Sequence, residues 1–355
     1  MKRLQPHPLD EMTPLERAQA IAEGRPYDRL PCVPFLGEIS AHLIGCTNIR
    51  EYENNPKLIA EGEIASFERY GLDGIGAGPN SMGLAAALGA NVIYPEDSIP
   101  YIGSAAIDND DAFNALEPVN PHTNPYIKGA MEALEMLTEA AHGISGVGSS
   151  LGGPFTVCAF LVGTDRLLKD CLKKPERVHH LMRIVTDSIK NCVDAIAPLG
   201  VGFGFADPVA SGSLISPKMY EKFVFSYMKE LCTYIYEKTG AKPSLHMCGN
   251  TVGIWKYIKQ LDICSLSIDN VVDLALAGQE LGDYFSILGN VPPVDVIMLG
   301  TKDDIFASVK DCVEKGRNIP KGYTIAPGCN IPLGTEIQKV DWFMDAARLY
   351  GKYSI

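Results

Sequence analysis

The sequence predicts an α/β protein, and more narrowly a closed (β/α)8 barrel of the TIM type. Eight short runs rich in Val, Ile and Gly recur along the 355 residues, and each run ends in a polar or small residue. Stretches with helix signals separate the runs. Alternating strands and helices form a parallel sheet, and eight such units suffice to close a barrel. A hydrophobic content of 46% can bury the large core that this fold needs.

The first element is an N-terminal helical extension over residues 1–30, which is expected to cover the bottom of the barrel. The stretch TPLERAQAIAEG begins with Thr13 as a candidate N-cap and carries Glu16 three positions later, the pattern of a capping box. Helices farther along, such as NPKLIAEGEIASFERYG, begin with a turn residue and a proline and stop at glycine. The eight predicted strands end at Glu38, Asn80, Ser150, Asp207, Cys248, Asp269, Val291 and Cys329.

Residues 81–143 are too many for a single crossover helix. Within them, ANVIYPEDSIPYI predicts an additional pair of strands, with helices on either side. The chain shows no linker and no repeat other than the barrel unit. We therefore expect residues 1–355 to form one domain.

Composition excludes some partners. A formal charge of −12 and a pI near 5.1 argue against nucleic acid and anionic membranes as partners, because the mean field would repel both. No run of about 18 apolar residues is present, and the first residues lack the apolar core of a signal peptide, so a cytoplasmic location is expected. The ten cysteines are then interpreted as thiols, most of them small hydrophobic residues.

Polar side chains end most of the predicted strands. In a (β/α)8 barrel the carboxyl ends of the strands build the active site, so these side chains should gather at one mouth. The alternative for any one of them is a strand end that meets solvent or caps a helix. The residues concerned are Glu38, Asp207, His246, Cys248, Asp269, Asn290 and Cys329.

Three of these residues form a candidate metal site. His246 and Cys248, two positions apart in PSLHMCGN, point to the same side of an extended strand, and Cys329 ends the last predicted strand. The rim of an eight-stranded barrel is narrow enough for them to meet. One imidazole and two thiolates suit Zn²⁺ with an open fourth position, as in catalytic zinc sites. The alternative is a buried His and Cys that only pack in the core.

The whole chain resembles the uroporphyrinogen decarboxylase superfamily, and within it the zinc-dependent, corrinoid-linked methyltransferases. The resemblance is carried by HMCGNT at 246–251, LGNVPPVDVIMLGT at 288–301, IAPGCNIPLGT at 325–335, SSLGGPFTVCAFLVGTDRLLKDCLKKPERVHHL at 149–181 and FADPVASGSLISPKMYEKFV at 205–224. It implies zinc on His246, Cys248 and Cys329. It also implies a methyl group exchanged between a small methylated substrate and a corrinoid.

The sequence departs from true uroporphyrinogen decarboxylases in its first-strand region, which reads RLPCVPFLGE and lacks their arginine-rich motif. A tetrapyrrole with many carboxylates would meet few cations there, so decarboxylation is the weaker alternative. A signature for binding a corrinoid is absent, so the corrinoid (cobalamin) is expected on a separate partner protein. A third alternative is a zinc-bearing barrel that only supports a partner. The sequence leaves open whether two copies pair as a homodimer.

The remaining rim residues have less defined roles. Glu38 is a candidate fourth, displaceable zinc ligand, and capping is its alternative. Asp207 and Asp269 could orient substrate or accept a hydrogen bond from His246, and they could also cap helices. Asn290 could bind substrate. For the methyl donor, the sequence leans towards O-demethylation of methoxylated aromatics, with transfer to a thiol of the coenzyme M type as the alternative.

Overall fold

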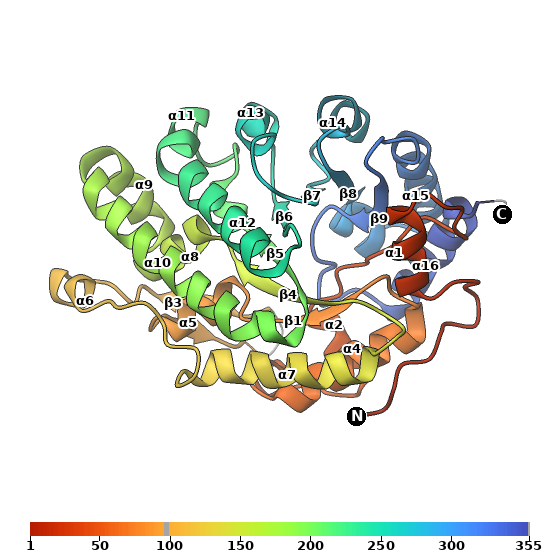
Figure 1. Ribbon diagram of the computed structural model, residues 1–355, viewed down its shortest axis with the longest axis horizontal. Helices are drawn as coiled ribbons and strands as arrows, with labels where there is room; N and C mark the ends of the chain where they lie inside the picture. The colour runs from red at the N-terminus through yellow and green to blue at the C-terminus, as the bar shows by residue number, and fades with distance from the viewer. Residues whose placement is uncertain (96–98, 354–355) are drawn as a thin grey trace.

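Seven parallel strands form one curled sheet in the computed structural model, which describes residues 1–95 and 99–353 (Figure 1). The order of the strands follows the chain, as expected for successive β/α units. Neighbouring strands are parallel throughout. The strands are β1 (Ile75–Ala77), β4 (Val147–Gly152), β5 (Gly202–Ala206), β6 (Ser244–Met247), β7 (Ser265–Ile268), β8 (Ser286–Val291) and β9 (Tyr323–Pro327).

The first predicted strand, residues 31–38, was wrong as a strand but occupies the expected place. Its only pairing is a bridge between Cys32 and Ile325 of β9. On its other side, the Cys32 amide donates to Asp73 Oδ2 at 2.7 Å, just before β1. Pro31 and Pro34 have no amide hydrogen, so a hydrogen-bonded ladder cannot extend through them. The barrel therefore closes through a short irregular segment in the eighth position.

Helices surround the sheet on its outer side (Figure 1). The longer ones are α1 (Pro14–Ala22), α4 (Pro56–Tyr70), α5 (Ser81–Ala87), α7 (Pro125–Ala141), α8 (Pro154–Val162), α9 (Thr164–Lys173), α10 (Pro175–Ile196), α12 (Ser226–Thr239), α14 (Leu274–Leu281), α15 (Lys302–Gly316) and α16 (Ile337–Gly351). Short helices are α2 (Ile39–Leu43), α3 (Ile49–Glu53), α6 (Asp110–Asn114), α11 (Pro217–Tyr220) and α13 (Trp255–Ile258). Within the described residues, none is long and apolar enough to span a membrane.

Two local predictions are confirmed. Thr13 and Glu16 form the capping box at the start of α1, and the Leu15 amide donates to Ile144 O, just before β4. The extension thus lies at the amino ends of the strands. The extra pair is β2 (Asn91–Ile93) with β3 (Tyr101–Ser104), which are antiparallel; residues 96–98 of that stretch lie outside the described residues. Three strand ends were wrong by two or three residues: β4 continues two residues beyond Ser150, β1 ends three residues before Asn80, and β9 ends two residues before Cys329.

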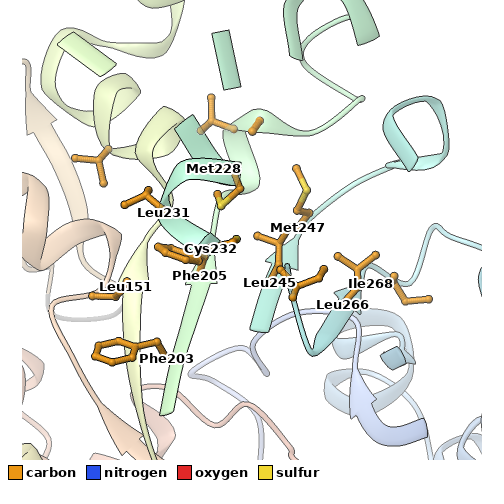
Figure 2. Packing of buried hydrophobic residues seen from close by; sticks show 14 of the residues in the cluster. Leu151, Phe203, Phe205, Met228, Leu231, Cys232, Leu245, Met247, Leu266 and Ile268 are labelled. Atoms are coloured by element: carbon orange, nitrogen blue, oxygen red, sulfur yellow. The ribbon is translucent and has the colours of Figure 1, made fainter. Parts of the chain in front are cut away.

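The outer face of the sheet holds the core. Leu151, Phe203, Phe205, Leu245 and Leu266 are buried on this face, and Phe205 lies beside Leu231 and Cys232 of α12 (Figure 2). Because side chains alternate along a strand, the residues between them face the inside of the barrel.

The inner positions carry little bulk. The register places Ser150, Gly204, Ser244, Ser265 and Ser286 side by side on five successive strands. Such positions in a barrel are usually filled by branched apolar side chains. Here Ser150 is exposed and Ser244 is half-buried, although both lie on inner strands of the sheet. The inside of the barrel below the mouth is therefore lined by small polar residues.

Candidate metal centre

His246, Cys248 and Cys329 meet at the carboxyl ends of the strands. One ligand atom from each lies within 4.8 Å of the other two. His246 Nε2 is 3.2 Å from Cys248 Sγ, and Cys248 Sγ is 3.6 Å from Cys329 Sγ. All three residues are partly buried. The convergence that the sequence predicted is present, across the 81 positions that separate the two cysteines.

The fold explains how this group forms. His246 is an inner residue of β6, because its neighbours Leu245 and Met247 face the core. Cys248 follows the last residue of β6, and Cys329 lies two residues after β9. Two strands, β7 and β8, separate β6 from β9 in the sheet. The curl of the sheet brings the ends of these two strands to one side of the mouth.

The spacing fits a tetrahedral zinc ion. Bonds of about 2.3 Å to sulfur and about 2.0 Å to nitrogen place neighbouring ligand atoms roughly 3.3–3.8 Å apart. The 3.6 Å between the two sulfur atoms lies within this range, and the 3.2 Å between His246 Nε2 and Cys248 Sγ is slightly shorter than it. The donor set is soft, as zinc sites with cysteine are. A fourth position would remain for a ligand from outside the group.

The two thiols differ in acidity. Hydrogen bonds from the Cys248 thiol and from His246 lower the pKa of Cys329, whereas the same contact raises the pKa of Cys248. The Cys248 thiol therefore keeps its proton and shares it with the Cys329 sulfur in a hydrogen bond. A positive charge would stabilise either sulfur atom as a thiolate. A divalent cation would take the place of that proton, since thiolates are the form that binds metal.

Ser267 fixes the orientation of the histidine. His246 Nδ1 lies 2.9 Å from Ser267 Oγ, and the two residues are register partners on β6 and β7. If Nδ1 carries the proton and donates to this hydroxyl, Nε2 is free to bind a metal. The sequence prediction that Asp207 or Asp269 accepts this bond was therefore wrong. The signal that could have found Ser267 is its place on the next strand, beside His246.

Asp269 and Asn290 build the loop that surrounds the cysteines. Asp269 Oδ2 accepts from the Gly249 amide at 2.7 Å, the residue next to Cys248, and Oδ1 accepts from Val271 N at 3.0 Å. Asn290 is 7% exposed, and its Nδ2 donates to the carbonyls of Asp269 and Val272. Both side chains are thus used by neighbouring backbone, which positions the metal ligands. Their expected contacts with substrate stay predictions.

Asp207 is not part of the three-residue group. It is fully buried, and its Oδ1 accepts from Thr156 N at 2.8 Å and from Thr156 Oγ1 at 2.7 Å. These contacts place its carboxylate at the amino end of α8, whose cap residue Gly153 has no side chain to do so. Burial raises the pKa of Asp207 to about 6, although the hydrogen bonds from Thr156 oppose the shift. The capping alternative has the direct geometric support.

Glu38 is not part of the three-residue group. It is half-buried, precedes α2 and makes no capping hydrogen bond with its side chain. Its charge contributes to raising the pKa of Glu53, which burial raises to about 7. Among the described residues, no fourth His, Cys, Asp or Glu lies within the group. The role of Glu38 as a zinc ligand stays a prediction.

Sequence reasoning missed Phe35. Its ring centroid is 6.2 Å from that of His246, and it is the one residue other than glycine with a positive φ among those described, at 47°. No pattern in the sequence marks Phe35 as different from a core residue.

The mouth around Phe35 is poor in cations. Neither Lys nor Arg occurs in the loops at 78–80, 207–216, 248–254, 269–273, 292–301 and 328–336.

Fold and donor set together define a (β/α) barrel enzyme with a sulfur-rich candidate metal centre at its carboxyl mouth. The chain belongs to the uroporphyrinogen decarboxylase family, whose profile matches residues 13–350. A solved methyltransferase from Methanosarcina mazei has the same fold, with a TM-score of 0.79 at 22% identity over 96% of this chain and 99% of its own. The predicted family, fold class and enzymatic nature are thereby confirmed.

Relatives in this family include two kinds of enzyme. The methylated-thiol–coenzyme M methyltransferase of Methanosarcina mazei is 25% identical, covering 96% of this chain and 90% of its own length. A methylcobamide:CoM methyltransferase of Methanosarcina barkeri is 24% identical, covering 94% and 96%. The uroporphyrinogen decarboxylase of Parasynechococcus marenigrum is 26% identical but covers only 79% of this chain and 81% of its own. Identity does not separate the two kinds, whereas coverage favours the methyltransferases.

Proposed function

We propose that this protein is a zinc-dependent methyltransferase that moves a methyl group between a small methylated compound and a corrinoid carried by a separate protein. The observation that carries the proposal is the group of His246, Cys248 and Cys329, whose ligand atoms lie within 4.8 Å of one another at the barrel mouth. These three side chains would hold the zinc. Relatives that cover nearly the whole chain, and that are methyltransferases by name, support the same activity.

Zinc, when bound by two thiolates and a neutral imidazole, supplies a mild Lewis acid that can activate a thiol or help an oxygen or sulfur atom to leave a methyl group. The chain itself orients the ligands. Ser267 sets the direction of the His246 ring, and Asp269 holds the backbone next to Cys248. The group lies at the carboxyl ends of β6 and β9, the side from which substrate and partner approach in this proposal.

The donor belongs to one of two classes within this proposal. An aryl methyl ether is the class that the sequence favoured, and a methylated thiol or a thiol acceptor is the other. A phenolate leaving group has a reference pKa of about 10, so its release near neutrality needs stabilisation by a nearby positive charge. In the proposal Glu38 is the carboxylate that competes with substrate for the fourth position.

Decarboxylation of a tetrapyrrole is the weaker candidate. Such a substrate carries several carboxylates, and burying each one requires a cation or several hydrogen-bond donors. The loops that follow β1 and β5 to β9 contain no Lys or Arg. The acidic residues Glu38 and Asp269 at these strand ends would add repulsion.

Metal analysis tests the site first. Purified wild type should contain about one equivalent of zinc, and Cys248→Ala should lose most of it because two ligands rarely retain the ion. Cys46→Ala is the matched control, since Cys46 is also a half-buried thiol but contacts Asn48 O outside the group. Equal zinc in all three proteins would reject the assignment. The folded state should persist without metal, because the barrel has its own core.

A transfer assay tests the activity. The protein should methylate reduced free cobalamin from a methyl donor, and it should be inactive when neither cobalamin nor a corrinoid protein is added. Dimethyl sulfide, methanol and 2-methoxyphenol are suitable donors, because they represent the thioether, alcohol and aryl ether classes. Stoichiometric zinc without any transfer would favour the alternative of a barrel that only supports a partner.

A further inference from the structure

We infer that Phe35 sets the size of the group that reaches the metal centre, admitting small aliphatic methyl compounds and excluding aromatic rings. The inference rests on the proposed function and narrows its substrate class. It is carried by the place of Phe35 in the barrel, by its backbone conformation and by its contact with His246. None of these depends on the presence of the metal.

Phe35 reaches across the mouth. It follows the segment 31–33, which lies beside β9 in the eighth position of the barrel. His246 is on β6, and three strands separate the two positions in either direction around the ring. Their ring centroids are nevertheless 6.2 Å apart, with planes tilted by 51°. The phenyl ring therefore points inwards and covers the space beside the ligands.

The backbone holds the ring in this place at a cost. Phe35 has φ 47°, a left-handed conformation that costs a residue with a Cβ atom about 1–2 kcal/mol. Its carbonyl accepts from the Ile331 amide at 3.0 Å, two residues beyond Cys329. The loop that carries a metal ligand thus also anchors the phenyl ring. A bulky residue in this conformation points to a role for the side chain, because glycine would avoid the strain.

Phe35 is larger than the inner residues that surround His246 on the neighbouring strands. Inner positions next to His246 carry Ala206 on one side and Ser267 on the other, and Ser244 lies one pleat below on the same strand. Leu288 is the larger inner neighbour, one strand farther away. Phe35 is half-buried, unlike the aromatic residues of the core. It therefore adds a large apolar ring beside inner positions that, apart from Leu288, carry only small side chains.

The distance between the rings limits the substrate. Aromatic pairs in contact have centroids about 4.5–7 Å apart, so Phe35 and His246 already form such a pair and leave no room for a third ring between them. A methyl group on a thiol, thioether or alcohol is far smaller. An aryl methyl ether that enters beside His246 would have to displace Phe35. We therefore assign the donor to small aliphatic compounds, against the aryl ether that the sequence favoured.

Ligand binding to the cobalt-substituted protein tests the assignment without methyl transfer. Thiolate binding to Co²⁺ gives an absorption band that can be titrated with ethanethiol and with phenylmethanethiol. Wild type should bind ethanethiol more tightly, and Phe35→Ala should shift the ratio of the two dissociation constants at least tenfold towards the larger thiol. Differences in thiol acidity cancel, because the same two thiols are compared in each variant.

Two further variants keep the test decisive. Phe35→Gly removes the ring and also relieves the left-handed strain, so it guards against loss of folding in Phe35→Ala and should shift the ratio equally. Phe306→Ala is the control, since Phe306 is half-buried on the outer helix α15 against Tyr350, and its ratio should equal that of wild type. An unchanged ratio in both Phe35 variants would overturn the inference. Failure of methyl transfer in every protein would instead reject the proposed function. The ratio of the two dissociation constants would still show whether Phe35 limits the size of the ligand.

Discussion

The two ends of the barrel treat polar groups in opposite ways. At the amino end, Arg17 is fully buried and binds Asp28 at 2.7 and 2.8 Å, and it also binds Asp73. Arg29 joins Asp73 to Asp10. At the carboxyl mouth, three soft donors converge with no opposite charge among them. The charges at the amino end are paired with one another, whereas the donors at the carboxyl mouth have no charged partner within their group.

This difference shows how the chain closes its barrel and where it keeps reactivity. At the amino end, Asp73 accepts from the Cys32 amide, so the ion pairs also fix the irregular segment that stands in for a strand. Buried charges must be paired, since an isolated one is very costly. At the mouth the unsatisfied groups are thiols and an imidazole, which can remain neutral until a metal arrives. The buried ion pairs thus support the fold, and the uncharged thiols and imidazole form the site.

Disrupting the ion pairs at the amino end of the barrel should have the largest effect on stability. Arg17→Met leaves Asp28 and Asp73 buried with fewer partners, so the free energy of unfolding should fall by about 3–5 kcal/mol. Urea unfolding of the metal-free protein measures it. Arg183→Met is the control, because its pair with Glu230 is about two-fifths exposed and should be worth less than about 1 kcal/mol. Equal losses in both variants would contradict the comparison.

Removing the support of a metal ligand at the carboxyl mouth should weaken zinc binding rather than folding. Ser267→Ala removes the partner of His246 Nδ1, so zinc affinity should fall about 10- to 100-fold while metal-free stability changes by less than about 1 kcal/mol. Competition with a chelator measures the affinity. Ser286→Ala provides the control, since this serine is in the neighbouring row of small residues and bonds Cys264 O instead. A large loss of metal-free stability in Ser267→Ala would make Ser267 a folding residue.

The sequence predicted the carboxyl mouth better than the amino end of the barrel. His246 and Cys248 lie two positions apart at the end of β6, and Cys329 follows β9, so the order of the strands in a curled sheet brings them together. The repeating pattern of apolar runs carries that order. Ligand positions on strands are therefore readable from spacing once the barrel is assumed.

The amino end could not be predicted in the same way, and neither could the seam, where residues 31–33 fill the eighth position between β9 and β1. The run PCVPFLGE has the composition of a strand, but its prolines remove the donors that a ladder needs, and side chains such as Asp73 replace them. Such replacements join residues that are far apart in the sequence. Phe35 was missed for a related reason, because a left-handed backbone at a phenylalanine leaves no local signature. Ser267 was missed because serines also lie on β4, β6 and β8, so a serine on a strand is no signal by itself.

The seam offers a pH-dependent test of the comparison. Glu63, on α4, accepts from the Gly76 amide of β1 at 3.1 Å, in the place of a neighbouring strand, and burial raises its pKa from 4.5 to about 7. An acid whose pKa is higher when folded loses its contribution to stability as pH rises from the unfolded value through the folded one.

Glu63→Gln removes this titration and keeps an acceptor for Gly76. The variant should gain about 1–2 kcal/mol over wild type at pH 8, less than the full shift because Glu63 is partly exposed, and almost nothing at pH 4.5. Urea unfolding at the two pH values measures the difference. A constant offset at both would show that the carboxylate is not a titrating part of the seam. Glu61→Gln, on the same helix but paired with Lys57 at the surface, is the control.

Asp207→Asn should have the smallest effect and decides between capping and catalysis. Asparagine keeps the oxygen that accepts from Thr156 and removes a charge that burial disfavours, so the loss of a charged cap and the relief of burial oppose each other. The free energy of unfolding at pH 8 should change by less than about 1 kcal/mol, and methyl transfer should stay within about twofold of wild type. A transfer rate reduced 100-fold with folding and zinc content intact would place Asp207 in the reaction after all. Its second oxygen has no hydrogen-bond partner among the described residues, so such a result would direct attention to that oxygen.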